Sequence, residues 1–210
     1  MDEKLKELVE LGIKFHGHKC PAMPLGIRAG LLALKLLGVE RAKDKELYCQ
    51  LETGPAHAML CFGDGVQVAT GCTFGKGNIE RLNYSKVGLI LIDVKNQRAV
   101  RVGLNPEFHK KALGSEFVKL REKGVPPQDI SPEVVDPLVE RVLSLPDEQI
   151  FRTGGPFAYE FKPRQGTFEW IECQGCGEVI FAHGVRIADG KTVCVVCGNY
   201  EPHPLAESKT

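Results

Sequence analysis

Apolar side chains recur at helical spacing in two neighbouring stretches near the N-terminus. Over residues 3–15 the spacing is mostly that of an amphipathic helix. Residues 21–37 are apolar on nearly all sides, which predicts a buried central helix that runs to about Val39. Pro21 suits the first turn of this helix, because the backbone N–H that proline lacks has no helical partner there.

Strand patterns follow further along the chain. Residues 46–53 alternate between apolar and polar side chains, which predicts a strand with one buried face. Cys49 lies on that face, as a small buried hydrophobe would. Residues 87–94 and 98–104 are apolar runs joined by a short polar turn, a pattern typical of a β-hairpin. A further strand is expected over residues 157–161.

The remaining elements are helices with recognisable starts. Pro106 and Pro132 each follow a capping side chain and precede an acidic residue. They predict helices that run to about Lys123 and about Leu145. Residues 57–69 also favour a helix, although two glycines weaken this prediction. Together the elements predict an α+β fold, with a core domain of mixed helices and antiparallel sheet.

Composition limits the classes of function. The chain has 210 residues, and its 27 Lys and Arg balance its 27 Asp and Glu, so no overall charge attracts nucleic acid or anionic lipid. No apolar stretch approaches the roughly 20 residues of a membrane span, and the charged first residues lack the apolar core of a signal peptide. We therefore expect a cytoplasmic protein with its eight cysteines as thiols or metal ligands, not disulfides.

Three side chains suited to metal binding or nucleophilic chemistry stand at alternate positions before the central helix: His16, His18 and Cys20. In an extended backbone alternate side chains point to the same side, and Gly17 leaves that side uncrowded. Cys20 would also lie at the positive end of the helix dipole, which favours its thiolate. The alternative interpretation is a loop whose residues only cap a buried helix.

A second group of such residues falls in the predicted helix over residues 57–69. His57, Cys61 and Asp64 would lie on one stripe of it, spaced by four and then three residues. A stripe of this kind could supply further metal ligands or an acid–base group. The alternative is a helix rim with a solvated Asp, which we favour for His57 taken alone.

A glycine-rich stretch follows at residues 70–78. Three glycines there indicate a backbone that turns tightly or approaches a ligand closely. The spacing is one residue short of a phosphate loop and Gly77 replaces the required Ser or Thr, which excludes ATP or GTP binding of that kind. Lys76 could still hold an anion, and Cys72 could be a further thiol of the same site.

The C-terminal part carries the strongest motif. A polar segment, residues 162–166, separates a core domain at 1–162 from a tail domain at 167–210. Two CxxC pairs in the tail, 17 residues apart, predict a tetrahedral structural zinc site. A tail of about 44 residues is too short for a sufficient apolar core, so metal would supply much of its folding free energy. A redox disulfide pair would need a βαβ context that the tail lacks. The expected ligands are Cys173, Cys176, Cys194 and Cys197.

The order and spacing of these motifs resemble the FmdE family, whose members are known as a subunit of molybdenum formylmethanofuran dehydrogenase. The motifs are residues 15–21 with 26–30, residues 61–67 and residues 70–78, and the resemblance covers about residues 10–105. The tail looks like the treble-clef zinc finger that some members carry. The resemblance implies an α+β core, often dimeric, with a metal-capable cleft. The matching positions are His16, His18, Cys20, Cys61, Asp64, Cys72 and Lys76.

These features lead to one main hypothesis. We expect a metal-binding accessory or metal-handling protein of one-carbon metabolism, related to the dehydrogenase of methanogenesis-type CO₂ reduction, with a second transition metal (Zn, Ni or Fe) in the core cleft. If the site is catalytic, Asp64 could act as a base and Lys76 as an anion holder, beside Cys20 and Cys61. A homodimer and the dehydrogenase subunits are the expected partners. The core ligands would be His16, His18, Cys20, Cys61 and Cys72.

Two alternatives remain open. The finger could make the protein a regulator or a protein-binding module; its three basic against six acidic side chains argue against DNA as the partner. Alternatively, Cys20 with Cys61 or Cys72 could form the centre of a thiol redox enzyme.

Overall fold

The computed structural model describes residues 3–55, 59–163 and 165–199. The chain divides into two compact units, Met1–Pro163 and Arg164–Thr210. The first unit holds a mixed sheet with its helices, and the second holds two short hairpins. The predicted α+β class is therefore confirmed.

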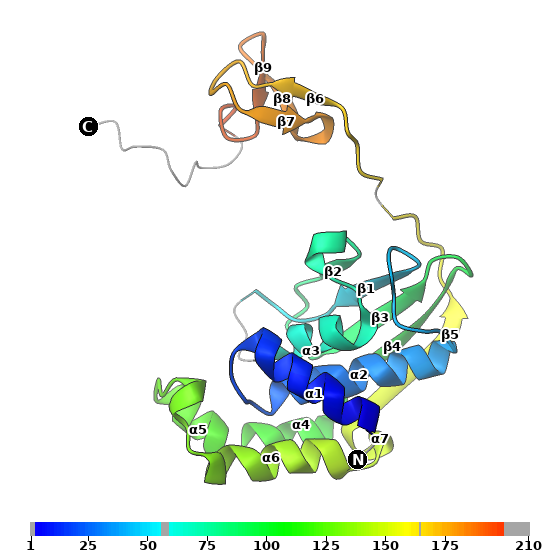
Figure 1. Ribbon diagram of the computed structural model, residues 1–210, viewed down its shortest axis with the longest axis vertical. Coiled ribbons are helices and arrows are strands. Elements are labelled where there is room, and N and C mark those ends of the chain that lie inside the picture. The colour runs from blue at the N-terminus through cyan, green and yellow to red at the C-terminus, as the bar shows by residue number, and fades with distance from the viewer. Residues whose placement is uncertain (1–2, 56–58, 164, 200–210) are drawn as a thin grey trace. The chain divides into compact units, whose positions relative to one another are not determined.

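A five-stranded sheet in the order β2-β1-β3-β4-β5 forms one layer of the first unit (Figure 1). The β1–β2 pair is parallel and the other pairs are antiparallel, including the predicted β3–β4 hairpin. Strand β1 is buried on both faces, contrary to the one-sided prediction, because the polar side chains of Gln50 and of Glu52, the residue after the strand, find partners. Arg101 donates two hydrogen bonds to Glu52, at 2.7 and 2.6 Å. The strands are β1 Leu47–Leu51, β2 Ile79–Arg81, β3 Gly88–Asp93, β4 Arg98–Leu104 and β5 Phe151–Ala158.

The central helix α2 lies between the sheet and α6 (Figure 1). It supplies many of the buried apolar side chains of the main core. Arg28 of α2 donates a hydrogen bond to the carbonyl of Leu145, at 2.6 Å, and forms an ion pair with Asp147. These contacts fix the end of α6 against α2. The helices are α1 Glu3–His16, α2 Ala22–Leu37, α3 Cys61–Thr70, α4 Pro106–Leu113, α5 Glu116–Glu122, α6 Pro132–Ser144 and α7 Asp147–Ile150, with short 3₁₀ turns at Phe74–Lys76 and Pro127–Asp129.

Glycines bring α2 and α3 into direct backbone contact. A Cβ added at Gly26 would lie 2.0 Å from the carbonyl oxygen of Phe62, and one added at Gly65 would lie 2.0 Å from that of Met23. Gly65 thus weakens the intrinsic helix propensity of α3 but is required for its packing. Because the two helices touch so closely, Cys61 at the start of α3 lies beside the N-terminal end of α2.

Two predicted elements differ from the structure. The helix expected from Pro106 to about Lys123 breaks into α4 and α5, and Ser115 starts the second helix by accepting a hydrogen bond from the N–H of Val118, at 3.4 Å. The last strand runs over Phe151–Ala158 and not over 157–161. It contains Gly-Gly-Pro, which hides the strand pattern, but β5 is an edge strand with a register shift opposite, where such residues are tolerated.

The second unit consists of the hairpins β6–β7 and β8–β9 around a small apolar cluster. Cys173, Val193 and Cys194 are its buried members. In the described part of the chain no helix is both long and apolar enough to cross a membrane. The strands are β6 Trp170–Glu172, β7 Val179–Phe181, β8 Val185–Ala188 and β9 Lys191–Cys194, with a 3₁₀ turn at Ala182–Gly184.

The α2–α3 contact predicts the effect of adding one methyl group. Gly26→Ala should lower the free energy of unfolding of the core by about 2 kcal/mol or more, because the backbone it meets has no rotamer to change. Gly75→Ala is the matched control, since its Cβ would meet nothing within 4 Å, and we expect a change within about 0.5 kcal/mol. Urea unfolding followed by helical circular dichroism measures both. A Gly26→Ala variant as stable as the control would contradict the close contact.

Candidate metal centre and adjoining pocket

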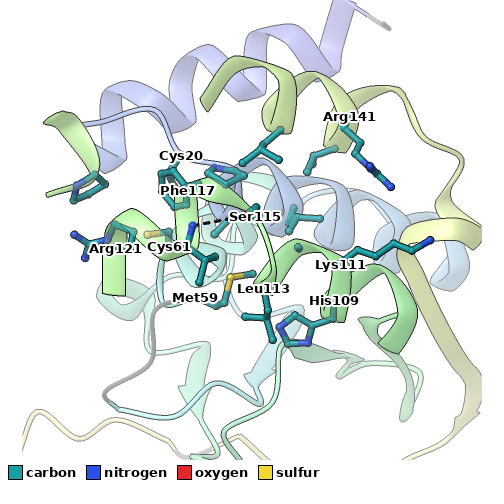
Figure 2. Close-up of a pocket in the computed structure, with 18 of the residues that line it drawn as sticks. Cys20, Met59, Cys61, His109, Lys111, Leu113, Ser115, Phe117, Arg121 and Arg141 are labelled. Carbon is teal, nitrogen blue, oxygen red and sulfur yellow. Dashed lines mark hydrogen bonds between the residues drawn. The ribbon is translucent and has the colours of Figure 1, made fainter. Parts of the chain in front are cut away.

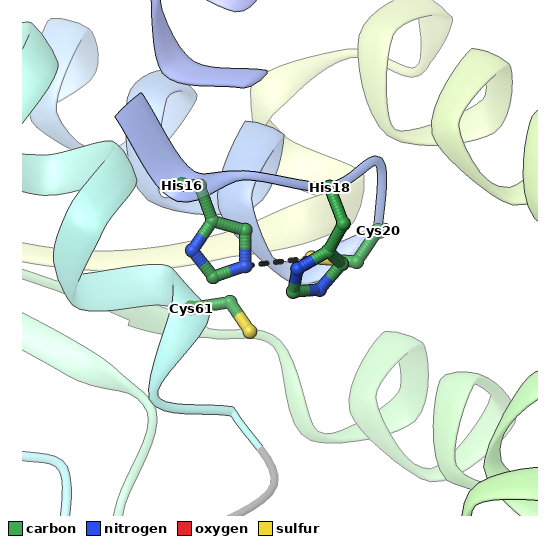
Figure 3. Close-up of side chains that lie close together, drawn as sticks. All are labelled: His16, His18, Cys20 and Cys61. Atoms are coloured by element: carbon green, nitrogen blue, oxygen red, sulfur yellow. Dashed lines mark hydrogen bonds between the residues drawn. The ribbon is translucent and has the colours of Figure 1, made fainter. Parts of the chain in front are cut away.

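Four side chains from three segments converge next to the start of α2. His16 ends α1, His18 and Cys20 lie in the connecting loop, and Cys61 begins α3. Each offers one ligand atom, and the four atoms all lie within 4.8 Å of one another (Figure 3). Within the group, His16 Nε2 lies 3.7 Å from Cys20 Sγ.

The backbone brings these residues together by a turn, and not by the extended alternation predicted from the sequence. His16 is the last residue of α1, so its side chain is placed by the helix. Gly17 then adopts a φ of 90°, in the left-handed region that favours glycine, and turns the chain out of α1. Gly17 is therefore needed for its backbone conformation as well as for the space it leaves.

A carboxylate fixes the orientation of His16. His16 Nδ1 lies 2.7 Å from Asp64 Oδ2, which leaves Nε2 directed at Cys20. The side-chain amide of Gln67 donates to the other Asp64 oxygen, at 3.3 Å, and its carbonyl accepts the N–H of Phe74, at 3.4 Å. Asp64 thus positions His16, and Gln67 links this pair to the glycine-rich loop.

His18 packs against His16, with the ring centroids 4.2 Å apart and the planes tilted by 45°. Within the described part of the chain, its buried Nε2 atom has no hydrogen-bond partner. Burial lowers the pKa of His18, and the nearby His16 and Arg121 lower it further. A neutral imidazole with a buried, unused nitrogen is the form that binds a metal ion.

The two thiols interact directly with each other. A hydrogen bond from the Cys61 side chain lowers the pKa of Cys20, and the backbone N–H groups of Met23 and Ala22 at the start of α2 act in the same direction against burial. The same contact raises the pKa of Cys61. The helix start therefore favours a thiolate at Cys20, as its position in the sequence indicates.

The structure places two other predicted site residues elsewhere. Cys72 is fully buried in the main core, where burial raises its pKa to about 11. Lys76 Nζ donates to the carbonyls of Ala42 and Lys43, at 3.2 and 3.4 Å. The reason is the length of α3, whose ten residues span about 15 Å and carry the glycine-rich loop away from Cys61. His57 lies outside the described residues.

A pocket of about 450 Å³ adjoins the four-residue group. His18, Cys20 and Cys61 form part of its wall, and residues of α4, α5 and α6 form most of the rest (Figure 2). We call these residues of α4, α5 and α6 the cover of the pocket. The sequence interpretation missed them, since they belong to helices with ordinary amphipathic patterns. The only available signal was the capping serine that breaks the predicted long helix. The cover includes Phe108, Lys111, Phe117, Arg121, Leu138 and Arg141.

The second unit holds the four cysteines of the CxxC pairs. One sulfur atom from each of them lies within 4.8 Å of the others, so the group could bind a metal such as zinc. Cys173 Sγ accepts the backbone N–H groups of Gly175 and Cys194, at 3.4 and 3.2 Å. Burial raises the pKa of the Cys173 thiol. Hydrogen bonds from the backbone N–H groups of Cys194, Cys176 and Gly175 have the larger combined effect, so the pKa falls to about 6. The arrangement therefore favours a thiolate at Cys173. The group comprises Cys173, Cys176, Cys194 and Cys197.

The protein thus combines an α+β core that carries a His₂Cys₂ group with a small unit that carries a group of four cysteines. The sequence model of the family described as "FmdE, Molybdenum formylmethanofuran dehydrogenase operon" matches residues 15–152. The chain therefore belongs to the FmdE family, as the motifs indicate.

Two similar proteins bear on fold and context. The crystal structure of a tungsten formylmethanofuran dehydrogenase FmdE-like protein from Syntrophus aciditrophicus matches with a TM-score of 0.60 and 22% identity, over 95% of this chain and 94% of that one. This match shows a common fold. A protein from Archaeoglobus fulgidus described as a probable S-adenosyl-L-methionine-binding protein is 32% identical over 214 residues, 94% of this chain and 54% of the relative. The chain thus spans about half the length of that curated relative.

The environments of the thiols predict a difference in reactivity. In chelator-treated, folded protein, iodoacetamide should alkylate Cys20 at least about tenfold faster than Cys72. Both thiols are buried, but Cys20 lines the pocket and its pKa is lowered, whereas Cys72 does not line the pocket and its pKa is raised to about 11. Peptide mass mapping over time measures both rates, with the buried Cys49 as a second slow reference. Equal rates at Cys20 and Cys72 would show that this account of the thiols is wrong.

Proposed function

We propose that this protein is a metal-binding accessory protein related to formylmethanofuran dehydrogenase, with a transition metal bound by His16, His18, Cys20 and Cys61. The observation that carries the proposal is the convergence of two imidazoles and two thiols within 4.8 Å. The buried Nε2 of His18, which has no hydrogen-bond partner among the described residues, supports it, since burying a polar atom without a partner costs free energy that metal ligation would recover.

The donor set fits a borderline transition metal. Imidazole and thiolate ligands suit Zn²⁺, and also Ni or Fe. Bonds of about 2.0–2.3 Å in a tetrahedral zinc site place the ligand atoms about 3.3–3.8 Å apart. The 3.7 Å between His16 Nε2 and Cys20 Sγ already has this spacing. Asp64 completes the arrangement by holding the other nitrogen of a ligand histidine, as carboxylates commonly do at metal sites.

The site residues then take the following roles. Cys20 and Cys61 are ligands, and Asp64 orients His16 and is not the base of a reaction. Lys76 has no part in the site, because its amine donates to backbone carbonyls. Four side-chain ligands would complete a tetrahedral shell, so a bound metal would supply Lewis acidity toward a polar group in the adjoining pocket only by expanding to five-coordination. Family membership supports the dehydrogenase subunits as partners, and we also expect a homodimer.

The finger takes a separate role in this proposal. Its four cysteines bind Zn²⁺ as a structural ion, without which so small a unit lacks enough buried apolar surface to fold. The finger is then a module for protein contacts.

A thiol redox enzyme is the second candidate, favoured by the direct interaction between Cys20 and Cys61. In that case the two thiols would form a disulfide under mild oxidation and release it on reduction. Metal binding and disulfide formation exclude each other at these two sulfurs, so the metal content of the reduced protein separates the candidates.

Metal analysis of variants tests the main proposal. The protein purified without added metal should hold two metal ions per chain. Cys61→Ser should lose one ion from the core, Cys176→Ser should lose the other from the finger, and Cys49→Ser should lose neither, because Cys49 lies in the main core away from both groups. Mass spectrometry of the native protein counts the ions. A Cys61→Ser variant that keeps both metal ions would refute the proposed metal site in the core.

The carboxylate behind His16 gives a finer test. Asp64→Asn should weaken metal binding at the core site by about tenfold to a hundredfold while the fold is kept, because the amide holds the imidazole less firmly and makes it a weaker donor. Asp129→Asn, on an exposed turn, is the control. Competition with a chromogenic chelator measures the affinity. Unchanged affinity in Asp64→Asn would argue that His16 is not a ligand.

A further inference from the structure

The pocket extends well beyond the metal-binding residues, and its sides are apolar. Its apolar lining residues include Leu25, Phe108, Phe117, Leu138 and Val142. A volume of about 450 Å³ is in the range of sites for small organic molecules. Water or a small inorganic ion would leave most of this apolar surface unused.

Cations mark two separate places on the wall of the pocket. Arg121 lies near His18, whose pKa it lowers. Lys111 and Arg141 lie on the other side of the pocket from Cys61 and Arg121 (Figure 2). All three cations are exposed and, among the residues that the structure describes, none forms an ion pair with a carboxylate. One acidic residue, Glu122, also lines the pocket.

This distribution of charge fits one kind of ligand. A neutral apolar molecule would make no use of the cations, and a molecule with one acid group would use only one end. Arg121 donates one hydrogen bond to the carbonyl of Val125, which leaves most of its five N–H groups for a ligand. The far cations, Lys111 and Arg141, are placed to pair with a second acid group beyond the apolar section.

We propose that the pocket binds an elongated organic dianion, with an apolar middle section and a carboxylate at each end. One carboxylate meets Arg121 next to the metal centre, and the other meets Lys111 and Arg141. The assignment of the first end rests on the proposed metal site, whereas the apolar section and the far cations do not depend on it.

Binding of straight-chain acids to the full-length, zinc-loaded protein tests the proposal. Isothermal titration calorimetry should show decanedioate binding about fivefold tighter than decanoate, since the second carboxylate gains an ion pair at a partly exposed site. In the double variant Lys111→Gln/Arg141→Gln this advantage should disappear while decanoate binds as before. Lys110→Gln is the matched control, because Lys110 is the neighbouring exposed lysine but does not line the pocket. Circular dichroism confirms that the variants fold.

The outcomes separate this proposal from the metal site. Equal affinity for the two acids, or the same advantage in the double variant, overturns the dianion proposal. A loss of affinity for both acids in Arg121→Gln, with no such loss in Lys119→Gln on the same helix, supports the placement of the first carboxylate. A protein that contains no core metal yet keeps the decanedioate advantage refutes the metal site and leaves the dianion assignment standing.

Discussion

The close approach of α2 and α3 is the constraint on which the site depends. Because Gly26 and Gly65 have no side chains, the backbones of the two helices are in direct contact, and the carbonyl group of Phe62 lies against Gly26 of α2. Cys61, one residue earlier, is thereby placed beside Cys20 at the start of α2. A larger separation, as between helices with ordinary side chains, would move the two thiols apart. The metal-binding group is therefore a consequence of helix packing.

The polar groups collected at this point are poorly satisfied by one another. His18 has a buried nitrogen without a partner in the described chain, and Cys20 and Cys61 share one hydrogen bond that lowers the pKa of one thiol and raises that of the other. A bound cation would satisfy all four donors together, whereas protons can satisfy only some of them. Asp64 already holds the His16 ring in the orientation needed for ligation, so binding an ion would require little structural change.

Sequence periodicity identified the elements whose signals are local. The buried helix after Pro21, the hairpin over residues 87–104 and the cysteine pairs of the finger all follow from spacing that the chain carries within a few residues. The prediction brought Cys72 and Lys76 into the site because the family resemblance places the glycine-rich loop in the same cleft as Cys61, yet the rigid length of α3 separates the loop from Cys61. The pocket cover could not be predicted, because it depends on how α4, α5 and α6 pack across the start of α2.

Anomalous diffraction from crystals of the reduced protein, collected above and below the absorption edge of the metal that it contains, tests the core site most directly. This account predicts two strong peaks per chain, one among the four finger cysteines and one bounded by His16 Nε2, the His18 ring, Cys20 Sγ and Cys61 Sγ. A single peak at the finger, with continuous density joining the sulfurs of Cys20 and Cys61, would contradict it.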